Sequence, residues 1–390
     1  MCYSGQNFYM TGVLTMTLQA SYPIPELPVP GVDFQTPELL KALVLAHRHL
    51  AELKGCAVSI PNQSILIDTL VLQEAKASSE VESYVTTQDE LFRAGLHIAE
   101  WVSPAAKEVS RYREALTHGL ERMREQQGIL GNGTLIALFQ LLKNSSETFR
   151  TSGGTVLKNE KTGATVFVPP QDGAQVQAHM QALERFINDD AACALDPIIK
   201  MALIHHQFES IHPFSDGNGR IGRILCVLYL VRTGLLDAPV LYLSRYINRH
   251  KGDYYRLLQA VRDAPGDAGA ASWQAWVIFM LNAVAQTARQ SVQLVGGMRD
   301  LMAETKRRMR ADTPKLYSQD LLNNLFRHPY TRIEFVQRDL GITRPTATRY
   351  LRQLAQAGLV RERRLGKHVY FINEPLVRLL AQGESQSGEI

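Results

Sequence analysis

The stretch that most constrains this chain runs from Ile211 to Arg223 and reads IHPFSDGNGRIGR. It separates two segments with helical patterns. The first opens at Asp196-Pro197, because Asp is a favoured N-cap and Pro suits the first helical position. The second begins at the glycines of the stretch and ends at Gly234, since glycine commonly follows the end of a helix. We therefore expect a loop between two helices, with its glycines at the start of the second helix.

The residue types in this loop suit the binding of a phosphate chain. The N-terminus of a helix presents free N–H groups and a positive dipole end, and glycines allow a ligand to approach the backbone closely. Arg220 and Arg223 share one face of the first turn, where cations oppose the dipole and need negative partners. Asp216 is an oxygen ligand of the kind that Mg²⁺ takes when it also binds phosphates. His212 can accept a proton near neutral pH. Together they predict transfer of a phosphorus group to a hydroxyl.

A structural turn is the alternative for any one part of this string, since His-Pro or Gly-Asn-Gly alone is usually a turn. The whole string matches HPFx(D/E)GNGRxxR at every fixed position and resembles the Fic family. The resemblance implies a protein adenylyltransferase that moves AMP from ATP to a Ser, Thr or Tyr hydroxyl of a protein, itself included, with Mg²⁺ as cofactor. It implies His212 as the catalytic base, Asp216 as the metal ligand and a phosphate site formed by Gly217, Asn218, Gly219, Arg220 and Arg223. Doc kinases carry a different loop, so GNGR favours the adenylyltransferase branch.

An upstream segment carries a second, looser likeness. Ser78 and Glu82 match the inhibitory pattern (S/T)xxxE(G/N) of many Fic proteins, although Ser83 stands where Gly or Asn is usual. Without the resemblance, these residues would be an ordinary solvated helix end. The resemblance implies that Glu82 pairs with Arg223 and takes the place of the γ-phosphate. ATP would then bind without correct alignment of its α-phosphate.

Other candidate residues follow from position within the family pattern. Gln207, His250 and Tyr254 are candidates for the nucleotide site, with Tyr254 against the base. The runs around residues 155–157 and 164–168 predict a short hairpin. The resemblance implies that it is a flap on which a target segment lies as an added strand. Its candidate target-binding residues are Thr155, Val156, Leu157, Val166 and Phe167.

The composition shifts at residues 311–314, and the pattern beyond it predicts a winged helix-turn-helix. Two helices precede the turn at Gly341, a third follows it, and the last part alternates around Leu365-Gly366 as a two-stranded wing does. Candidate DNA contacts on the third helix are Arg344, Thr348, Arg349 and Arg352. Docking of a protein is the alternative use. A second function class therefore stays open, a nucleotide-sensing DNA-binding transcriptional regulator. A complete loop favours the enzyme, because a sensor needs phosphate ligands but no base such as His212.

Composition limits the class of protein and the compartment in which we expect it. The hydrophobic content of 45% and charged content of 21% are typical of a globular protein, and a net charge of +4 does not by itself indicate nucleic acid. The four cysteines lack C-x-x-C spacing, and the N-terminus lacks the basic and apolar regions of a secretory signal. The longest apolar run, residues 224–231, is too short for a bilayer. We expect a cytoplasmic protein without a membrane partner, and leave a homodimer open.

The expected fold is mainly α-helical: a Fic helical core with a small β-hairpin flap, followed by the winged helix-turn-helix. The expected divisions are an extended segment at 1–35, a helical region with the inhibitory helix at 36–112, the catalytic core at 113–300, a linker at 301–314, the winged helix-turn-helix at 315–375 and a tail at 376–390.

Overall fold

The computed structural model describes residues 23–82, 103–158, 163, 165–191, 193–264, 267–365 and 368–385. Within these ranges the chain is mainly helical, as predicted. Its helices are α1 (Pro37–Ala57), α2 (Gln63–Val81), α4 (Pro104–Glu125), α5 (Asn132–Lys143), α6 (Gly173–Asn188), α7 (Pro197–Ile211), α8 (Asn218–Arg232), α9 (Leu243–Arg249), α10 (Lys251–Asp263), α11 (Asp267–Asp312), α12 (Gln319–Arg327), α13 (Ile333–Leu340), α14 (Arg344–Gln356) and α15 (Glu374–Ser385). Its strands are β1 (Leu157–Lys158), β2 (Thr165–Phe167), β3 (Tyr330–Thr331), β4 (Arg361–Leu365) and β5 (His368–Ile372).

The helix starts and ends around the central loop follow the local sequence rules. Asp196 caps α7, and its carboxylate accepts a hydrogen bond from the N–H of Ile198 at 2.8 Å. α8 begins directly after Gly217, which has a φ of +75°, and Gly234 follows its end with a φ of +72°. These left-handed conformations favour glycine, which has no Cβ to clash with the backbone. The predicted helix-loop-helix is confirmed.

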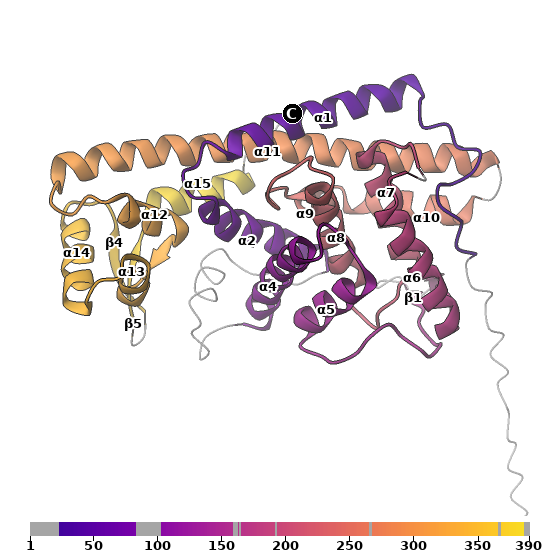
Figure 1. Ribbon diagram of the computed structural model, residues 1–390, viewed down its shortest axis with the longest axis horizontal. Coiled ribbons are helices and arrows are strands. Elements are labelled where there is room, and N and C mark those ends of the chain that lie inside the picture. The colour runs from indigo at the N-terminus through magenta and orange to yellow at the C-terminus, as the bar shows by residue number, and fades with distance from the viewer. Residues whose placement is uncertain are drawn as a thin grey trace, which may run out of the picture.

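Helix α11 is the long axis of the molecule. It spans 46 residues and runs the length of the structure, with α1 packed along it (Figure 1). Its first part packs against α7, α9 and α10, and its later part against α12 and α15. Trp276 and Met298 are fully buried along its length. One uninterrupted helix therefore connects the part of the chain around the loop to the C-terminal part.

Two expected divisions differ from the observed elements. Residues 301–312, expected as part of a linker, continue α11 without a break. Buried Met302 and Met309 explain this continuity, since they give the segment an apolar side to pack. Residues 376–385, expected as part of a tail, lie in α15, where Leu376 and Leu380 are buried. In both segments a few buried apolar side chains give the helix a side to pack.

The centre of the larger part is the α7–α8 pair. Every residue of α7 from Ile198 to Ile211 is buried, which is the pattern of a helix enclosed on all sides. Helices α2, α4 and α5 pack around α8, while α6 and α11 pack on α7. The loop from residue 212 to 217 is therefore held between two helices that have little freedom to move.

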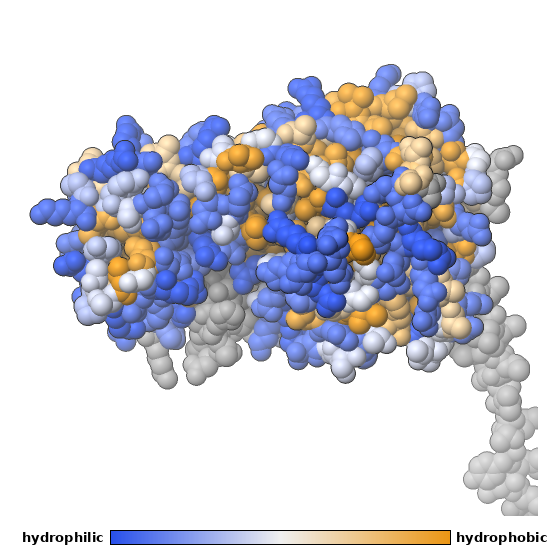
Figure 2. Space-filling view, viewed as in Figure 1, coloured by the Kyte–Doolittle hydropathy of each residue, from blue (hydrophilic) through white to orange (hydrophobic). Residues whose placement is uncertain are grey.

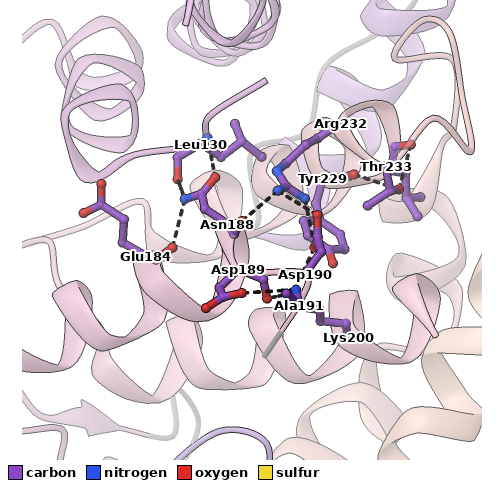
Figure 3. Close-up of polar contacts among 11 residues, drawn as sticks. Leu130, Glu184, Asn188, Asp189, Asp190, Ala191, Lys200, Tyr229, Arg232 and Thr233 are labelled. Carbon is purple, nitrogen blue, oxygen red and sulfur yellow. Dashed lines mark hydrogen bonds and ion pairs between the residues drawn. The ribbon is translucent and has the colours of Figure 1, made fainter. Parts of the chain in front are cut away.

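A polar cluster fixes the far end of α8 (Figure 3). The Arg232 guanidinium donates to both carboxylate oxygens of Asp190 at 2.9 and 3.2 Å and to the Asn188 carbonyl at 3.1 Å. Lys200, whose side chain is 2% exposed, donates to Asp190 at 3.1 Å. The Asn188 amide in turn exchanges hydrogen bonds with the backbone of Leu130 at 2.9 and 3.0 Å. The cluster ties α8 to the end of α6, the first turn of α7 and the segment before α5.

The C-terminal part consists of α12, α13 and α14 with a three-stranded antiparallel sheet in the order β3-β5-β4. The three predicted helices and the two predicted strands are present, and Gly341 ends α13 with a φ of +65°. The short strand β3 was not predicted; it pairs Tyr330 with Ile372. Arg327 of α12 forms an ion pair with Asp68 of α2, with Nε 2.5 Å from Oδ2.

Apolar side chains gather on the outer side of α1, at the top of the molecule in Figure 2. Leu40, Val44 and Leu45 are 44%, 66% and 45% exposed there. Over the part of the chain that the structure describes, none of the helices combines the length and the hydropathy that crossing a bilayer requires.

Candidate functional site

The loop between α7 and α8 is braced by its own side chains. His212 ends α7 in the left-handed region with a φ of +50° and a ψ of +59°. The Asn218 side chain accepts from the Phe214 N–H and donates to the Phe214 carbonyl, both at 2.9 Å. Because Asn218 is 1% exposed and its amide is bonded to Phe214, contact of Asn218 with a phosphate would come through its backbone N–H. The predicted phosphate residue thus has a side chain that shapes the loop.

The first turn of α8 lies directly against a carboxylate. A Cβ added to Gly219 would come within 2.4 Å of Glu82 Oε1 and 3.0 Å of an Arg223 guanidinium nitrogen. Any other residue at position 219 would overlap the Glu82 carboxylate where it now lies, so this contact requires glycine. The negative group therefore sits where a helix N-terminus attracts anions.

The predicted pairing of Arg223 with the end of α2 is present. Arg223 is 1% exposed, and its NH2 lies 2.9 Å from Glu82 Oε1. Its Nε donates to Ser78 Oγ at 2.8 Å and its NH2 to the Ser78 carbonyl at 3.0 Å. A buried guanidinium with a carboxylate and two further acceptors is a well-satisfied cation. The structure thus brings together Ser78, Glu82, Gly219 and Arg223, which lie far apart in the sequence.

Arg220 has a different carboxylate partner. It is 1% exposed and forms an ion pair with Glu108 of α4, and its NH2 lies 3.5 Å from Asp216 Oδ1. The two arginines of the first turn therefore each have an acidic partner, as their position at the positive end of the dipole requires. Sequence reasoning missed Glu108. Glu108 is 7% exposed, and the sequence of α4 carries no signal that distinguishes it from the other charged residues of that helix.

Asp216, the predicted metal ligand, is held by a lysine that sequence reasoning also missed. Lys143 Nζ lies 2.5 Å from Asp216 Oδ2, and the Gly217 N–H donates to Oδ1 at 2.5 Å. The Asp216 side chain remains 57% exposed. Among the described residues, no group of three or more His, Cys, Asp or Glu side chains could hold a metal alone. One exposed carboxylate beside an anion site nevertheless fits a magnesium ion that takes its other ligands from phosphates and water.

The electrostatic surroundings of His212 keep its ring neutral. Burial lowers the pKa of His212 to about 4, and the positive charges of Arg262 and Arg150 act in the same direction. At neutral pH the imidazole therefore has a lone pair that can accept a proton.

Arg150 positions the His212 backbone and was likewise missed. Its Nε donates to the His212 carbonyl at 2.8 Å, and its NH2 donates to the Ile211 carbonyl at 3.2 Å. Its backbone N–H donates to the Pro213 carbonyl at 2.8 Å. Three consecutive carbonyls at the end of α7 are thus bound by one residue, which holds His212 in its left-handed conformation.

Two buried carboxyl groups lie near Arg223. Glu74 accepts hydrogen bonds from the Ser244 N–H at 3.0 Å and the Tyr112 hydroxyl at 3.1 Å. Burial raises the pKa of Glu74 to about 7, and burial raises the pKa of Glu209 to about 7 as well. The charge of Arg223 lowers both pKa values, but less than burial raises them. Glu82 is thus the carboxylate that directly pairs with Arg223.

Three predicted nucleotide-site residues have other surroundings. The Gln207 amide donates to the Pro25 carbonyl at 2.8 Å, and His250 packs on Tyr246 with ring centroids 4.2 Å apart. Tyr254 is 1% exposed, and its hydroxyl lies 2.9 Å from His205 Nε2. Its ring is enclosed in the core, and the stacking of Tyr254 on a base stays a prediction. Its neighbour Tyr255 is 43% exposed and is the better candidate.

The predicted hairpin is present as β1 and β2, which pair Leu157 with Phe167 and Lys158 with Thr165. Residues 159–162 and 164 of its turn lie outside the described part of the chain. Val156 and Val166 are 37% and 44% exposed, as residues that meet a target should be. Of the other three flap candidates, Thr155 and Leu157 are half-buried, and the Thr155 carbonyl accepts from Gln171 at 2.9 Å. Phe167 is only 5% exposed, and the guanidinium carbon of Arg262 lies 3.8 Å from its ring centroid.

The four predicted DNA contacts share one side of α14. Arg344, Arg349 and Arg352 are exposed, while Thr348 is half-buried and donates to the Arg344 carbonyl at 2.8 Å. Arg344 also pairs with Glu334 of α13 at 2.8 Å. Arg361, Arg363 and Arg364 of β4 are exposed as well.

Comparison with known proteins defines the class of this fold and site. Three family models match the chain: "Fic/DOC family N-terminal" at residues 40–121, "Fic/DOC family" at 134–230 and "Protein adenylyltransferase SoFic-like, C-terminal domain" at 301–376. The chain therefore contains regions that match the Fic/DOC family models, at residues 40–121 and 134–230. The second model contains the whole loop from His212 to Arg223, and the first contains Ser78 and Glu82.

Curated relatives match a short region. The protein adenylyltransferase Fic of Drosophila yakuba is 35% identical over 96 residues, which are 25% of this chain and 18% of that protein. The protein adenylyltransferase fic-1 of Caenorhabditis briggsae is 43% identical over 49 residues, or 13% of this chain and 10% of that protein. The match thus spans less than a fifth of the length of these relatives.

Solved structures share the fold. A Fic family protein from Desulfovibrio desulfuricans G20 has a TM-score of 0.54 at 21% identity and covers 86% of this chain and 96% of its own. A Fic domain containing signaling protein from Bacteroides thetaiotaomicron has a TM-score of 0.51 at 19% identity and covers 64% of this chain and 96% of its own. At these identities the likeness concerns the fold alone.

Proposed function

We propose that this chain is a protein adenylyltransferase that transfers AMP from ATP to a hydroxyl of a protein, its own hydroxyls included. One observation carries the proposal: a neutral, half-buried His212 stands at one end of a loop whose other end is the N-terminal turn of α8. Base and anion site are thereby only a few residues apart on a braced backbone. The names of the curated relatives support the same activity.

The proposed reaction uses this arrangement directly. His212 takes the proton of the target hydroxyl as its oxygen forms a bond to the α-phosphorus of ATP. The bond from that phosphorus to the bridging oxygen breaks, and pyrophosphate leaves with the electron pair. The N–H groups of Gly217 to Gly219 and the two arginines hold the phosphates. Asp216 would hold a magnesium ion, which supplies positive charge to the departing phosphates.

We further propose that Glu82 inhibits the enzyme. Its carboxylate pairs with Arg223 at 2.9 Å and lies against Gly219. A γ-phosphate that needs the same guanidinium must displace Glu82 or bind elsewhere, and then the α-phosphate is not aligned with the hydroxyl. The two Ser78 contacts hold Arg223 toward α2 and support this inhibited arrangement.

The test combines ATP labelled at the α or the γ position with magnesium and three forms of the protein: wild type, Glu82→Gly and Glu82→Gly/His212→Ala. We expect label from the α position alone to stay on protein, to increase in Glu82→Gly and to disappear in the double variant. Label from the γ position would indicate a kinase instead. Equal labelling of wild type and Glu82→Gly would contradict inhibition by Glu82.

A second candidate function is a nucleotide-sensing DNA-binding regulator that uses a winged helix. The observation that favours it is the set of exposed arginines on α14 and β4. A gel shift with a specific DNA sequence, weakened by salt, combined with no label transfer from ATP, would support this function over the enzyme. Binding that is unaffected by Arg349→Ala/Arg352→Ala would argue against it.

A further inference from the structure

Two arginines from different parts of the chain bind the end of α7. Arg150, which lies between α5 and β1, binds the three consecutive carbonyls of residues 211–213. Arg262 of α10 binds the two residues before them. Its NH2 donates to the Glu209 carbonyl at 3.1 Å, and its Nε donates to the Oγ of the fully buried Ser210 at 3.1 Å. Five consecutive residues at the end of α7 are thus each bound by one of the two arginines.

The Arg262 guanidinium also lies on the hairpin. Its central carbon is 3.8 Å from the ring centroid of Phe167, the last residue of β2, which is 5% exposed. Stacking of a guanidinium on an aromatic ring is favourable, and more so where water is excluded. One side chain of α10 therefore joins β2 to the backbone just before His212.

The base of the hairpin is closed, so that a shift of Phe167 moves both strands. Gln171, which follows β2, accepts from the Gly154 N–H at 2.7 Å and donates to the Thr155 carbonyl at 2.9 Å. Phe167 itself is paired with Leu157 of β1. The chain before β1 and the chain after β2 are thus bound to each other. Whatever holds Phe167 in place therefore holds the hairpin as a unit.

We propose that Arg262 is a positioning residue that sets the place of the hairpin relative to His212. An exposed hairpin can take an extended segment as an added strand, and Val156 and Val166 are exposed on this one. A hydroxyl on such a segment reacts only within hydrogen-bond reach of the base, and a misplacement of about 1 Å can cost roughly 100-fold in rate. The link from Phe167 through Arg262 to α7 fixes this distance. The inference rests on the proposed function, which assigns His212 the role of the base.

Transfer of AMP to water provides the internal reference. His212 takes a proton from water, the water oxygen forms a bond to the α-phosphorus of ATP, and free AMP and pyrophosphate result. Water reaches the base without the hairpin, whereas the hydroxyl of a bound protein segment does not. The ratio of AMP placed on protein to AMP released therefore reports the position of the hairpin. A general loss of folded enzyme lowers both products and leaves the ratio unchanged.

Incubation of the Glu82→Gly form with α-labelled ATP measures this ratio. Protein-bound label and free AMP are counted after adding Phe167→Leu, Arg262→Met or both. We expect each substitution to lower the ratio by about tenfold and the pair to lower it no further, because both break one link. The matched control Arg310→Met removes an arginine that stacks on Tyr317 at 4.7 Å, and should leave the ratio unchanged. An unchanged ratio in Arg262→Met, or losses that multiply in the pair, would overturn the positioning role.

Hydrogen exchange tests the link without ATP. Arg262→Met is expected to speed exchange of the backbone N–H groups of residues 165–168 and 210–212 by at least about threefold, and Arg310→Met to leave them unchanged. Arg262→Lys keeps the charge but loses the planar stack, so it should restore slow exchange at 210–212 more than at 165–168. Unchanged exchange at 165–168 in Arg262→Met would overturn the link.

The two measurements fail separately. Faster exchange in Arg262→Met, combined with no AMP transfer by any form of the protein, would contradict the proposed function and leave the link between β2 and α7 supported. Transfer with an unchanged ratio would support the enzyme and overturn the role of Arg262. Circular dichroism and the unfolding midpoint show whether each variant is folded.

Discussion

The Lys143 ammonium lies 2.5 Å from the Asp216 carboxylate, at the site where a magnesium ion is proposed to bind. Lys143 belongs to the last turn of α5, and Asp216 to the loop before α8. The two side chains are 25% and 57% exposed, so the pair is accessible to water and to ions. A lysine and a magnesium ion cannot share this oxygen without repulsion, and binding of the metal would displace the lysine.

Replacing Lys143 by Met is therefore expected to strengthen magnesium binding in the presence of ATP. Exposed ion pairs contribute about 0.2–1 kcal/mol, so the half-saturating magnesium concentration should fall by roughly twofold to fivefold. Calorimetric titration of magnesium into the protein with ATP measures this without turnover. Lys143→Arg keeps the charge and is the control. A higher half-saturating concentration in Lys143→Met would instead mean that Lys143 holds a phosphate.

Arg150→Met is expected to slow AMP transfer with little change in the KM for ATP. The substitution removes two charged hydrogen bonds to the carbonyls of Ile211 and His212, each of which contributes about 1.5–3 kcal/mol. Even a partial loss of the position of His212 should lower kcat by roughly tenfold. The measurement is made in the Glu82→Gly form, where the signal is expected to be larger.

A pH profile separates this role of Arg150 from a purely structural one. The Arg150 charge lowers the pKa of His212, so its removal should raise that pKa and move the acidic limb of the rate profile to higher pH. Arg150→Lys keeps the charge but loses the planar set of donors, and should lower kcat without moving the limb. An unmoved limb in Arg150→Met would contradict the assigned electrostatic contact.

The sequence predicts the parts of this site that are local. The helix start at Pro197, the glycines before α8 and the order of elements in the C-terminal part all follow from short-range rules of capping and turns. The pairing of Arg223 with Glu82 could be predicted only through the resemblance, since nothing in composition or spacing relates residues that far apart. Its geometry agrees with that prediction.

The residues that were not predicted share one property: each acts through a contact between distant segments. Glu108, Lys143 and Arg150 lie on α4, on α5 and after α5, and each reaches the loop across the fold. Helical periodicity predicts which side of a helix is apolar. It does not predict which charged residue of the helix contacts which partner in a distant segment. Sequence does not separate Tyr254 from Tyr255 for the same reason. The two are adjacent, and only the packing against Trp276 determines which one is enclosed.

Substitution of Tyr255 should therefore affect ATP binding, whereas substitution of Tyr254 should affect the stability of the fold. Tyr255→Ala is expected to weaken ATP binding, since loss of a ring that stacks on a base costs about 1–3 kcal/mol. Tyr254→Phe removes the hydroxyl that contacts His205 and should lower the free energy of unfolding by about 1 kcal/mol while leaving the Kd for ATP unchanged. Binding is measured by calorimetry and stability by denaturant unfolding. Unchanged ATP affinity in Tyr255→Ala would contradict the assignment of Tyr255 as the base contact.

The stability of the protein should depend on the charge of Glu209. Burial raises its pKa, Arg223 and Arg262 lower it, Glu82 raises it, and the net result is a pKa of about 7 instead of the ordinary 4.5. The folded pKa exceeds the unfolded one, so the stabilising contribution is complete below pH 4.5 and is lost as pH rises through 7. The full difference corresponds to about 3 kcal/mol.

Glu209→Gln keeps the shape of the protonated side chain and removes the titration. We expect the unfolding free energy of wild type, relative to that of the variant, to fall by up to about 3 kcal/mol between pH 5 and pH 8. The comparison with the variant is essential. Glu74 titrates in the same direction, and burial lowers the pKa values of His205 and His212, which makes stability rise with pH below about 6.5. These contributions are common to both proteins and cancel in the difference. Parallel stability curves for the two proteins would show that Glu209 is ionised at a normal pKa, in which case Arg223 would have a second negative partner beside Glu82.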